Sequence, residues 1–210
     1  ANVTVVPAGA TRSDVRAFDT GPANMVLDAL AKALFDAPYD DQGHHAELGT
    51  PLPGLVADLL ADDFFQQSPP RSTGRREFGA DYAQRLWTEV RTRNGSRHDA
   101  LATAVLLTAS SVYHAYAQFI RPQTPADRVL VSGGGLHNAA LMDALRNAFA
   151  PIPVVSTATV GVDPDMKEAI GMAVLAHEWT HGTATALPSV TGATHAARLG
   201  GLHLPPTSHD

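Results

Sequence analysis

The sequence predicts a mixed α/β domain in which helices pack on a sheet. Three observations support this. Short β-branched runs lie near the start, long segments carry apolar residues at helical spacing, and the stretch "VLVSGGGLHN" reads as a strand, a glycine turn and a helix start. Of the 210 residues, 44% are hydrophobic, which is enough for a sizeable core.

The first half of the chain predicts a hairpin followed by helices. Apolar and β-branched runs at 2–6 and 15–19 flank a Pro- and Gly-containing turn region, as in a β-hairpin. The apolar spacing in 24–35 predicts a helix, and 52–60 predicts a short one. Two further helices, 81–93 and 98–120, meet at Asn94-Gly95, and the second is apolar nearly all round, which is typical of a buried helix.

The second half alternates strands and helices. We expect a strand at 129–131, a helix from about Asn138, a strand at 152–157 and a helix over 163–179 with Pro164 in its first turn. The small, polar residues after 181 indicate a loop-like tail. The order of strands and helices along the whole chain predicts a mixed sheet with a helical insert.

Composition excludes several classes of function. A formal net charge of −6 without clustered Lys and Arg argues against a nucleic-acid partner. The absence of cysteine excludes disulfides and thiolate metal sites. No apolar run approaches the roughly 20 residues that span a bilayer, so we expect no membrane partner. The chain opens with Ala inside a predicted strand, so we interpret it as cut from something longer.

The stretch "AHEWTHG" contains the pattern H-E-x-x-H, which can hold zinc on one helix face. A zincin needs a third protein ligand, yet Asp and Glu are absent from 182–209. The extended pattern also fails, because Ala184 and Leu187 stand where Gly and His are required. His195, His203 and His209 lie at no recognised spacing. We therefore interpret the motif as a coincidence.

The glycine turn at Gly133, Gly134 and Gly135 is the most informative segment. Glycines at the end of a strand let a ligand approach the backbone, and the following helix start near Asn138 presents free N–H groups. These features indicate a nucleotide site. The alternative is a plain tight turn between strand and helix.

Three other segments carry polar side chains suited to a site. "FDTGPAN" places Asp19 at a strand end before a helix start, where it could contact phosphate, magnesium or sugar, or where Asp19 or Asn24 could simply cap the helix. "PPRSTGRREF" offers Arg71 for phosphate or carboxylate, or as part of a solvated helix start. Glu168 is expected to face inward and to bind a hydroxyl or orient water, while Asp165 in the same first turn complements the helix dipole.

These segments, in this order, resemble the anhydro-N-acetylmuramic acid kinase family. The resemblance covers essentially the whole chain and is carried by the following stretches: "ANVTVV", "FDTGPANMVLDAL", "DQGHHAELG", "SPPRSTGRREF", "VSGGGLHNAALMDAL", "VDPDMKEAIGMAVLAHEWTHG" and "LPSVTGATHAARLGGLHLP".

The resemblance implies an actin-like ATPase superfold with two α/β domains and ATP in the cleft between them. It implies a kinase that uses ATP, Mg²⁺ and water to open a 1,6-anhydro sugar ring while it phosphorylates the 6-oxygen. The product, N-acetylmuramic acid 6-phosphate, belongs to cell-wall recycling, and such an enzyme is cytoplasmic.

By the same resemblance, residues 1–210 form only the carboxyl-terminal lobe. The family's amino-terminal phosphate loop and its catalytic aspartate have no counterpart here, and the second phosphate loop survives only as Ala1-Asn2. The catalytic residue is therefore unknown in this chain, no metal ligand is assigned, and we expect the isolated chain to be inactive.

The resemblance assigns the remaining site residues by position. The ATP-binding segment consists of Gly133, Gly134, Gly135 and Asn138. The cleft for phosphate and substrate consists of Asp19, Thr20, Gly21, Pro22, Asn24 and Arg71. Glu168 is expected near the sugar. The family usually has Gly at the position of Ala23, which would strain the turn if φ were positive, and Lys at the position of Arg71.

Two other functions stay open on the sequence. One is a non-catalytic module of the same fold that binds a nucleotide or sugar. The other is an actin-like kinase for a different small acceptor. The resemblance also favours a homodimer, for which the apolar helix over 101–119 could pack either internally or against a second copy.

Overall fold

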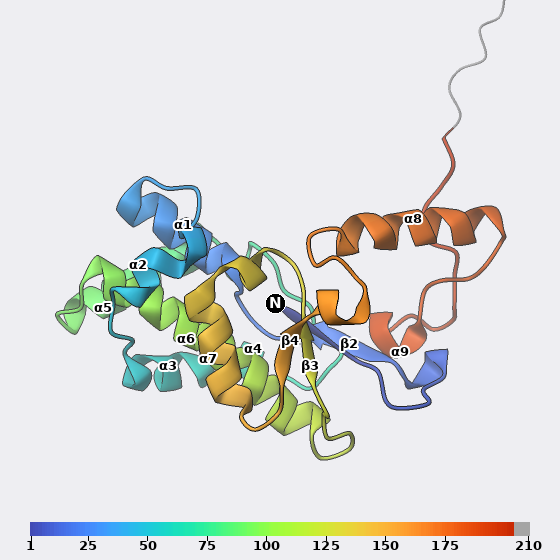
Figure 1. Cartoon of the computed structure of the whole chain (residues 1–210), viewed down its shortest axis with the longest axis horizontal. Helices are drawn as coiled ribbons and strands as arrows, with labels where there is room; N and C mark the ends of the chain where they lie inside the picture. The colour runs from blue at the N-terminus through green and yellow to red at the C-terminus, as the bar shows by residue number, and fades with distance from the viewer. Residues whose placement is uncertain (204–210) are drawn as a thin grey trace, which may run out of the picture.

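The structure is a computed structural model that describes residues 1–203. It is an α/β structure in which helices gather around two small sheets, so the predicted class is confirmed at this level. Figure 1 shows the helices α1 to α7 on one side of the amino-terminal hairpin and α8 and α9 on the other. The predicted single mixed sheet is wrong for the described residues, because each sheet has two strands.

The amino-terminal hairpin pairs β1 (Asn2–Val5) with β2 (Arg16–Asp19) in antiparallel register. The register sets Val3 opposite Phe18, and Phe18 is buried in the core. The alternation of inward and outward side chains along a strand explains why only part of this short hairpin is covered. The predicted hairpin is confirmed.

The second sheet is parallel. Strands β3 (Val129–Val131) and β4 (Val154–Ser156) lie side by side and are joined by helix α7 (Ala139–Phe149). Parallel neighbours need such a crossover connection, and the predicted order of strand, glycine turn, helix and strand is confirmed. Each of these strands is only three residues long, and within the described residues neither pairs with a strand of the hairpin.

Helix α6 (Arg97–Ala115), continued by a π-helical turn (Tyr116–Ile120), is the centre of the core. Eleven of its 19 residues are buried, including Leu101, Val105 and Leu107. It contacts α1, α2, α3, α5 and α7. A helix that is apolar on most sides is stable in water only when other elements surround it, and the predicted burial is confirmed.

The same segment shows that the expectation of no apolar run long enough to span a bilayer was wrong. The helix Arg97–Ile120 is long and apolar enough to cross a membrane by length and composition, with a mean hydropathy of 1.2 over its best window. In the structure, 67% of that window is buried by the surrounding helices, as in a core helix.

Short helices and turns surround α6. Ser96 caps α6 by accepting from the backbone of Asp99, whose carboxylate binds the Ser96 N–H in return. The other helices are α1 (Asn24–Phe35), α2 (His44–Glu47), α3 (Pro53–Leu60), α4 (Asp63–Gln66) and α5 (Ala80–Thr92), with 3₁₀ turns at Arg12–Asp14, Asp41–Gly43, Gly134–His137 and Thr157–Val160.

Two glycines let loops lie directly against α6. A Cβ at Gly21 would lie 2.6 Å from Ser111 Oγ, and one at Gly49 would lie 2.2 Å from the His98 carbonyl oxygen. Real side chains do not approach this closely, so these positions need glycine for space rather than for dihedral freedom. The contact at Gly21 fixes the start of α1 against the core helix.

Helix α8 (Lys167–Thr180) differs from the prediction. Pro164 and Asp165 precede the helix instead of forming its first turn, because the Pro164 carbonyl accepts from Gly133 N–H and Asp163 Oδ1 accepts from Asp165 N–H. An inward-facing side chain, as expected for Glu168, is not found in this helix, because α8 contains no buried residue. A short helix, α9 (Pro188–Thr191), interrupts the predicted loop-like tail.

Ala23 holds a backbone conformation that favours glycine. Its φ is 47° and its ψ is −140°, directly before the first residue of α1. A side chain there costs about 1–3 kcal/mol of strain. The sequence predicted strain at this turn if φ of Ala23 were positive, and φ is positive.

Replacing Ala23 by glycine should stabilise the protein. The relieved strain exceeds the roughly 0.5–1 kcal/mol of added backbone entropy, so Ala23→Gly should raise the free energy of unfolding by about 1 kcal/mol. Urea denaturation measures this. The matched control is Ala33→Gly, at an exposed position inside the same helix, which should destabilise by about 1 kcal/mol. A loss of stability in Ala23→Gly would contradict the strain argument.

Candidate functional site

The glycine turn and the start of α1 meet in space although about 110 residues separate them. A Cβ placed on Gly134 would lie 3.3 Å from Asn24 Nδ2, and one on Gly135 would lie 3.3 Å from Asn24 Oδ1. Asn24 is the first residue of α1, so its amide lies along one side of the turn. The two segments predicted separately as site elements are therefore neighbours.

The turn lies at the surface and has room above it. Gly134 is exposed, and nothing lies within 4 Å of a Cβ placed on Gly133. Gly133 has a φ of 83°, which favours glycine. A backbone without side chains, open on one side and flanked by an amide, fits the approach of a planar or phosphate-bearing ligand.

The segment before α8 forms the other side of the turn. The Gly133 N–H donates to the Pro164 carbonyl oxygen at 3.1 Å. His137 Nε2, at the end of the turn, lies 2.8 Å from Asp165 Oδ1. Neither His137 nor this contact of Asp165 was predicted from the sequence, and the only signal was the position of the histidine two residues after the glycines.

Asn138 has a structural role that differs from the predicted contact with ATP. It is buried, and its Oδ1 accepts from the Leu141 N–H at 2.9 Å, which caps α7. Gly43 packs against the same atom, because a Cβ there would lie 2.4 Å from it. The capping bond orients the beginning of α7 below the glycine turn.

Asp19 connects the end of β2 to the loop that follows α4. Its Oδ2 accepts from the Thr73 N–H at 2.7 Å, and its backbone N–H donates to the Arg71 carbonyl oxygen at 3.1 Å. The structure thus joins two segments that the sequence marked separately. Thr73, a hydroxyl residue of the predicted segment "PPRSTGRREF", holds the carboxylate in place through its backbone N–H.

Arg71 is buried, contrary to its predicted role as a phosphate or substrate ligand. Its Nη1 donates to the carbonyl oxygens of Phe64, Phe65 and Gln67 at 2.8–3.0 Å, and its Nε donates to the carbonyl oxygen of Asp19 at 2.8 Å. Burial lowers the pKa of the guanidinium, and the charge of Asp19 offsets part of this effect. Bound to four carbonyl oxygens, Arg71 holds the loop together rather than facing a cleft.

The turn between Asp19 and Asn24 is mostly enclosed. Thr20, Gly21 and Pro22 are buried, although all three were predicted to line the cleft. The Ala1 nitrogen donates to the Gly21 carbonyl oxygen at 2.7 Å. These residues position Asn24, which is the member of this predicted set that lies beside the glycine turn.

Glu168 does not face inward. Its side chain is 90% exposed and lies 3.4 Å from Lys167 Nζ. Because α8 begins at Lys167, Glu168 sits in its first turn, where a carboxylate complements the helix dipole. The expected position beside a buried sugar is not found in the described structure.

The histidine pair of the H-E-x-x-H pattern lies at the exposed end of α8. The rings of His177 and His181 are 4.2 Å apart. Within residues 1–203, no group of three or more histidine or acidic side chains is arranged to hold a metal ion. His209 lies outside the described residues. The structure therefore provides no third ligand for a zinc site in this range.

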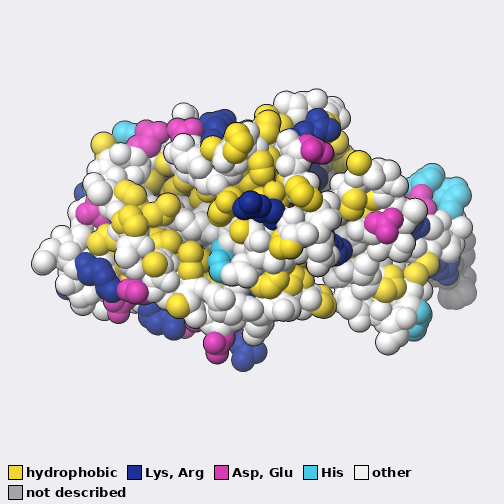
Figure 2. Space-filling view, turned by 90° about the horizontal axis from the view of Figure 1, so that it is seen from below, with side chains coloured by type: hydrophobic (Ala, Val, Ile, Leu, Met, Phe, Trp, Pro, Cys, Tyr) yellow, Lys and Arg dark blue, Asp and Glu magenta, His cyan; other side chains and the backbone are white. Residues whose placement is uncertain are grey.

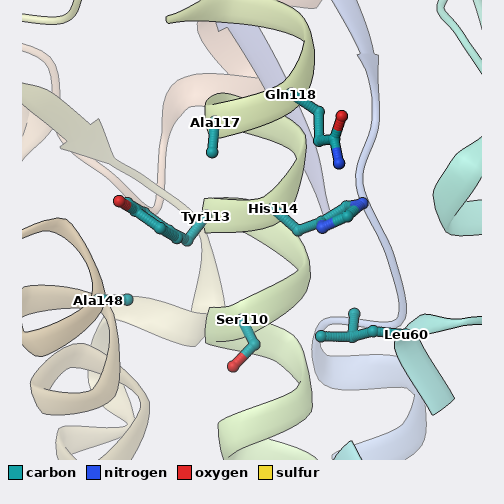
Figure 3. Close-up of a pocket in the computed structure, with 7 residues that line it drawn as sticks. All are labelled: Leu60, Ser110, Tyr113, His114, Ala117, Gln118 and Ala148. Atoms are coloured by element: carbon teal, nitrogen blue, oxygen red, sulfur yellow. The ribbon is translucent and has the colours of Figure 1, made fainter. Parts of the chain in front are cut away.

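Two cavities lie away from the glycine turn. One, of about 440 Å³, is bounded by α6, α3 and α7, and Figure 3 shows Tyr113 and His114 projecting to opposite sides of α6 along it. The other, of about 580 Å³, lies between α3 and α5, where burial raises the pKa of Tyr82 to about 12. Neither is lined by a residue predicted for the site.

The surface shows no basic patch on the face seen in Figure 2. Hydrophobic side chains gather over its broad left part, and Lys and Arg lie scattered among them.

Arg71 offers a direct test of its structural role. Arg71→Met should lower the free energy of unfolding by about 3 kcal/mol or more, because several buried carbonyl oxygens lose their donor. Arg71→Lys should cost only about 1 kcal/mol, since one ammonium can serve the three carbonyl oxygens now bound by Nη1. The control Arg76→Met, at an exposed position, should change little. Wild-type stability in Arg71→Met would contradict this assignment.

Comparison of the sequence with known proteins identifies a family. The family model for anhydro-N-acetylmuramic acid kinase matches residues 1–205. A protein of that name from Salinibacter ruber is 58% identical over 205 residues, which cover 98% of this chain and 52% of the relative.

More distant relatives give the same result. Proteins of the same name from Caldanaerobacter subterraneus subsp. tengcongensis and Bacillus cereus are 37% and 36% identical, covering 97% and 98% of this chain. The chain spans about half the length of these curated relatives, 52% and 54%. This chain belongs to the anhydro-N-acetylmuramic acid kinase family.

Proposed function

We propose that this chain is the carboxyl-terminal lobe of a two-lobe kinase with an actin-like fold. The observation that carries the proposal is the match of 98% of the chain, at 58% identity, to a named anhydro-N-acetylmuramic acid kinase about twice as long. The α/β architecture and the surface glycine turn support it.

The proposed reaction opens 1,6-anhydro-N-acetylmuramic acid and phosphorylates it. Water adds its oxygen to C1, the bond between C1 and O6 breaks, and O6 takes the γ-phosphoryl group of ATP. The products are N-acetylmuramic acid 6-phosphate and ADP, and the proton lost by water leaves to a base. Such a reaction depends chiefly on positioning ATP and the acceptor together.

The chain's own residues are suited to hold the adenine nucleotide. The glycine turn leaves the space above Gly133 open, and Asn24 lies along the side of Gly134 and Gly135 with one amide donor and one acceptor. His137 and Asp165 border the same turn. We assign the adenosine side of ATP to this region.

Magnesium is part of the proposal as the companion of the ATP phosphates. Since residues 1–203 contain no cluster of three acidic or histidine side chains arranged for a metal, we assign it no ligand in this part of the chain. Mg²⁺ commonly binds through one or two carboxylates and substrate phosphates, so the other lobe and ATP would supply its ligands.

The remaining parts of the proposal concern setting and assembly. We propose a cytoplasmic enzyme that acts on a small amino sugar, in keeping with its dependence on ATP. A homodimer is also part of the proposal. Helix α6 is largely used in the core, so the face still open to a second copy is the one that lines the cavity in Figure 3.

A chimera tests the function. Residues 1–205 of this chain would replace the matching part of the Salinibacter ruber protein, and an assay coupled to ADP release would be run with the anhydro sugar. We expect turnover by the chimera and none by the isolated chain, because half a cleft cannot position both substrates. Activity of the isolated chain, or an inactive but folded chimera, would contradict the proposal.

Variants of the same chimera test the nucleotide contact. Gly134→Val fills the space beside Asn24 without a forbidden dihedral, so it should raise the KM for ATP by about tenfold, which corresponds to ~1.4 kcal/mol. Gly54→Val, at an exposed glycine of α3 with open space around it, is the control and should leave KM unchanged. Equal KM values would contradict the assignment.

A further inference from the structure

The outer surface of α8 is apolar and has no partner within the described residues. Met166 directly precedes the helix, and Met166, Ile170 and Val174 are 51%, 45% and 53% exposed. Since they are four residues apart, they form one stripe along the helix. Met172 is also exposed, at 66%, but it lies two residues from Ile170 and therefore on another side of the helix. We call Met166, Ile170 and Val174 the α8 stripe.

The opposite side of α8 is the one that faces the rest of the molecule. Leu175, Glu178 and Trp179 are half-buried, and the guanidinium of Arg198 lies 5.2 Å from the centre of the Trp179 ring. In Figure 1, α8 lies at the end of the molecule away from α1 to α7, above α9. The α8 stripe is therefore turned away from the core.

Such a surface needs an explanation in physical terms. A 14-residue helix whose centre reads "AIGMAVLA" is typical of a buried element, and contiguous exposed apolar side chains usually mark an interface. The stretch is also part of the match to relatives, which extends over 98% of the chain. The relatives therefore carry a corresponding segment in a polypeptide about twice as long.

We propose that the α8 stripe is the docking surface for the half of the full-length protein that this chain does not cover. This rests on the two-lobe organisation proposed above. The relatives contain that half in the same polypeptide, so the partner is present at high effective concentration and needs no second binding event. The contact would bury the stripe, and the removal of its apolar surface from water would stabilise the association of the two lobes.

The position of α8 gives this docking a consequence for the site. The residues just before the helix are bound to the glycine turn, through Pro164 to Gly133 and through Asp165 to His137. A lobe docked on α8 would therefore meet the molecule close to the turn that we assign to ATP. Docking of the lobe on α8 would therefore also complete the nucleotide cleft.

Oxidation of the native methionines tests the proposal without any substitution. The chain has four methionines, and Met142 is buried at 3% exposure while Met166 and Met172 are exposed. The isolated chain and the chimera would be treated with hydrogen peroxide and followed by mass spectrometry. We expect oxidation of Met166, which lies in the stripe, to slow on the order of tenfold or more in the chimera, with Met142 slow in both.

Two results would overturn the proposal. One is unchanged oxidation of Met166 in a folded chimera. The other is protection of Met166 in the isolated chain that rises with protein concentration, alongside dimer formation in sedimentation, since this would make a second copy the occupant. Kinase activity is measured separately, so loss of turnover with protection intact would count against the proposed function and not against the docking surface.

A substitution gives an independent measurement. Ile170→Glu should leave the melting temperature of the isolated chain nearly unchanged, because the side chain is exposed there, and should lower that of the chimera by about 5 °C or more. Leu48→Glu, at a 63% exposed leucine outside α8, is the control and should be neutral in both. Equal effects of Ile170→Glu in the two proteins would overturn the proposal.

Discussion

The burial of helix α6 is the constraint on which the arrangement of this chain depends. Leu101, Leu107 and many small side chains leave this helix no long polar face, so other elements must cover it on most sides. Two of the covering segments approach so closely that only glycine fits, at Gly21 and Gly49. The core helix therefore determines where the connecting turns lie, and not only which residues are buried.

The position of the candidate site follows from this packing. Because Gly21 is pressed against Ser111 of α6, α1 begins at a fixed point and Asn24 reaches the glycine turn. Arg71 and Thr73 hold Asp19, at the end of β2, in place through its carbonyl oxygen and its carboxylate. These buried contacts thus fix the position of Asn24 beside the glycine turn at the surface. Helix α8 follows the segment bound to that turn, and its apolar stripe is exposed.

Local patterns predicted the elements that the structure contains. The hairpin, α1, α6 and the strand before the glycine turn follow from spacing and composition, and the conjunction of Asn24 with the turn agrees with the segments chosen from sequence. The sequence could not show that Arg71 would bind carbonyl oxygens, because that depends on the path of residues 64–67. The inward orientation expected for Glu168 was wrong for a similar reason. The Pro164 carbonyl oxygen accepts from the Gly133 N–H, so the helix begins only at Lys167, and within the described residues no element buries the side chains of α8.

We assign the adenine nucleotide to the glycine turn, with Asn24 beside it. Chemical-shift mapping of the ¹⁵N-labelled chain during titration with ATP tests this assignment, because it reports contact without requiring turnover. We expect the largest shifts on Gly133, Gly134, Gly135 and His137 and on the side-chain amide of Asn24. Shifts centred instead on Tyr113 and His114, at the cavity of α6, or no shifts at millimolar ATP, would contradict it.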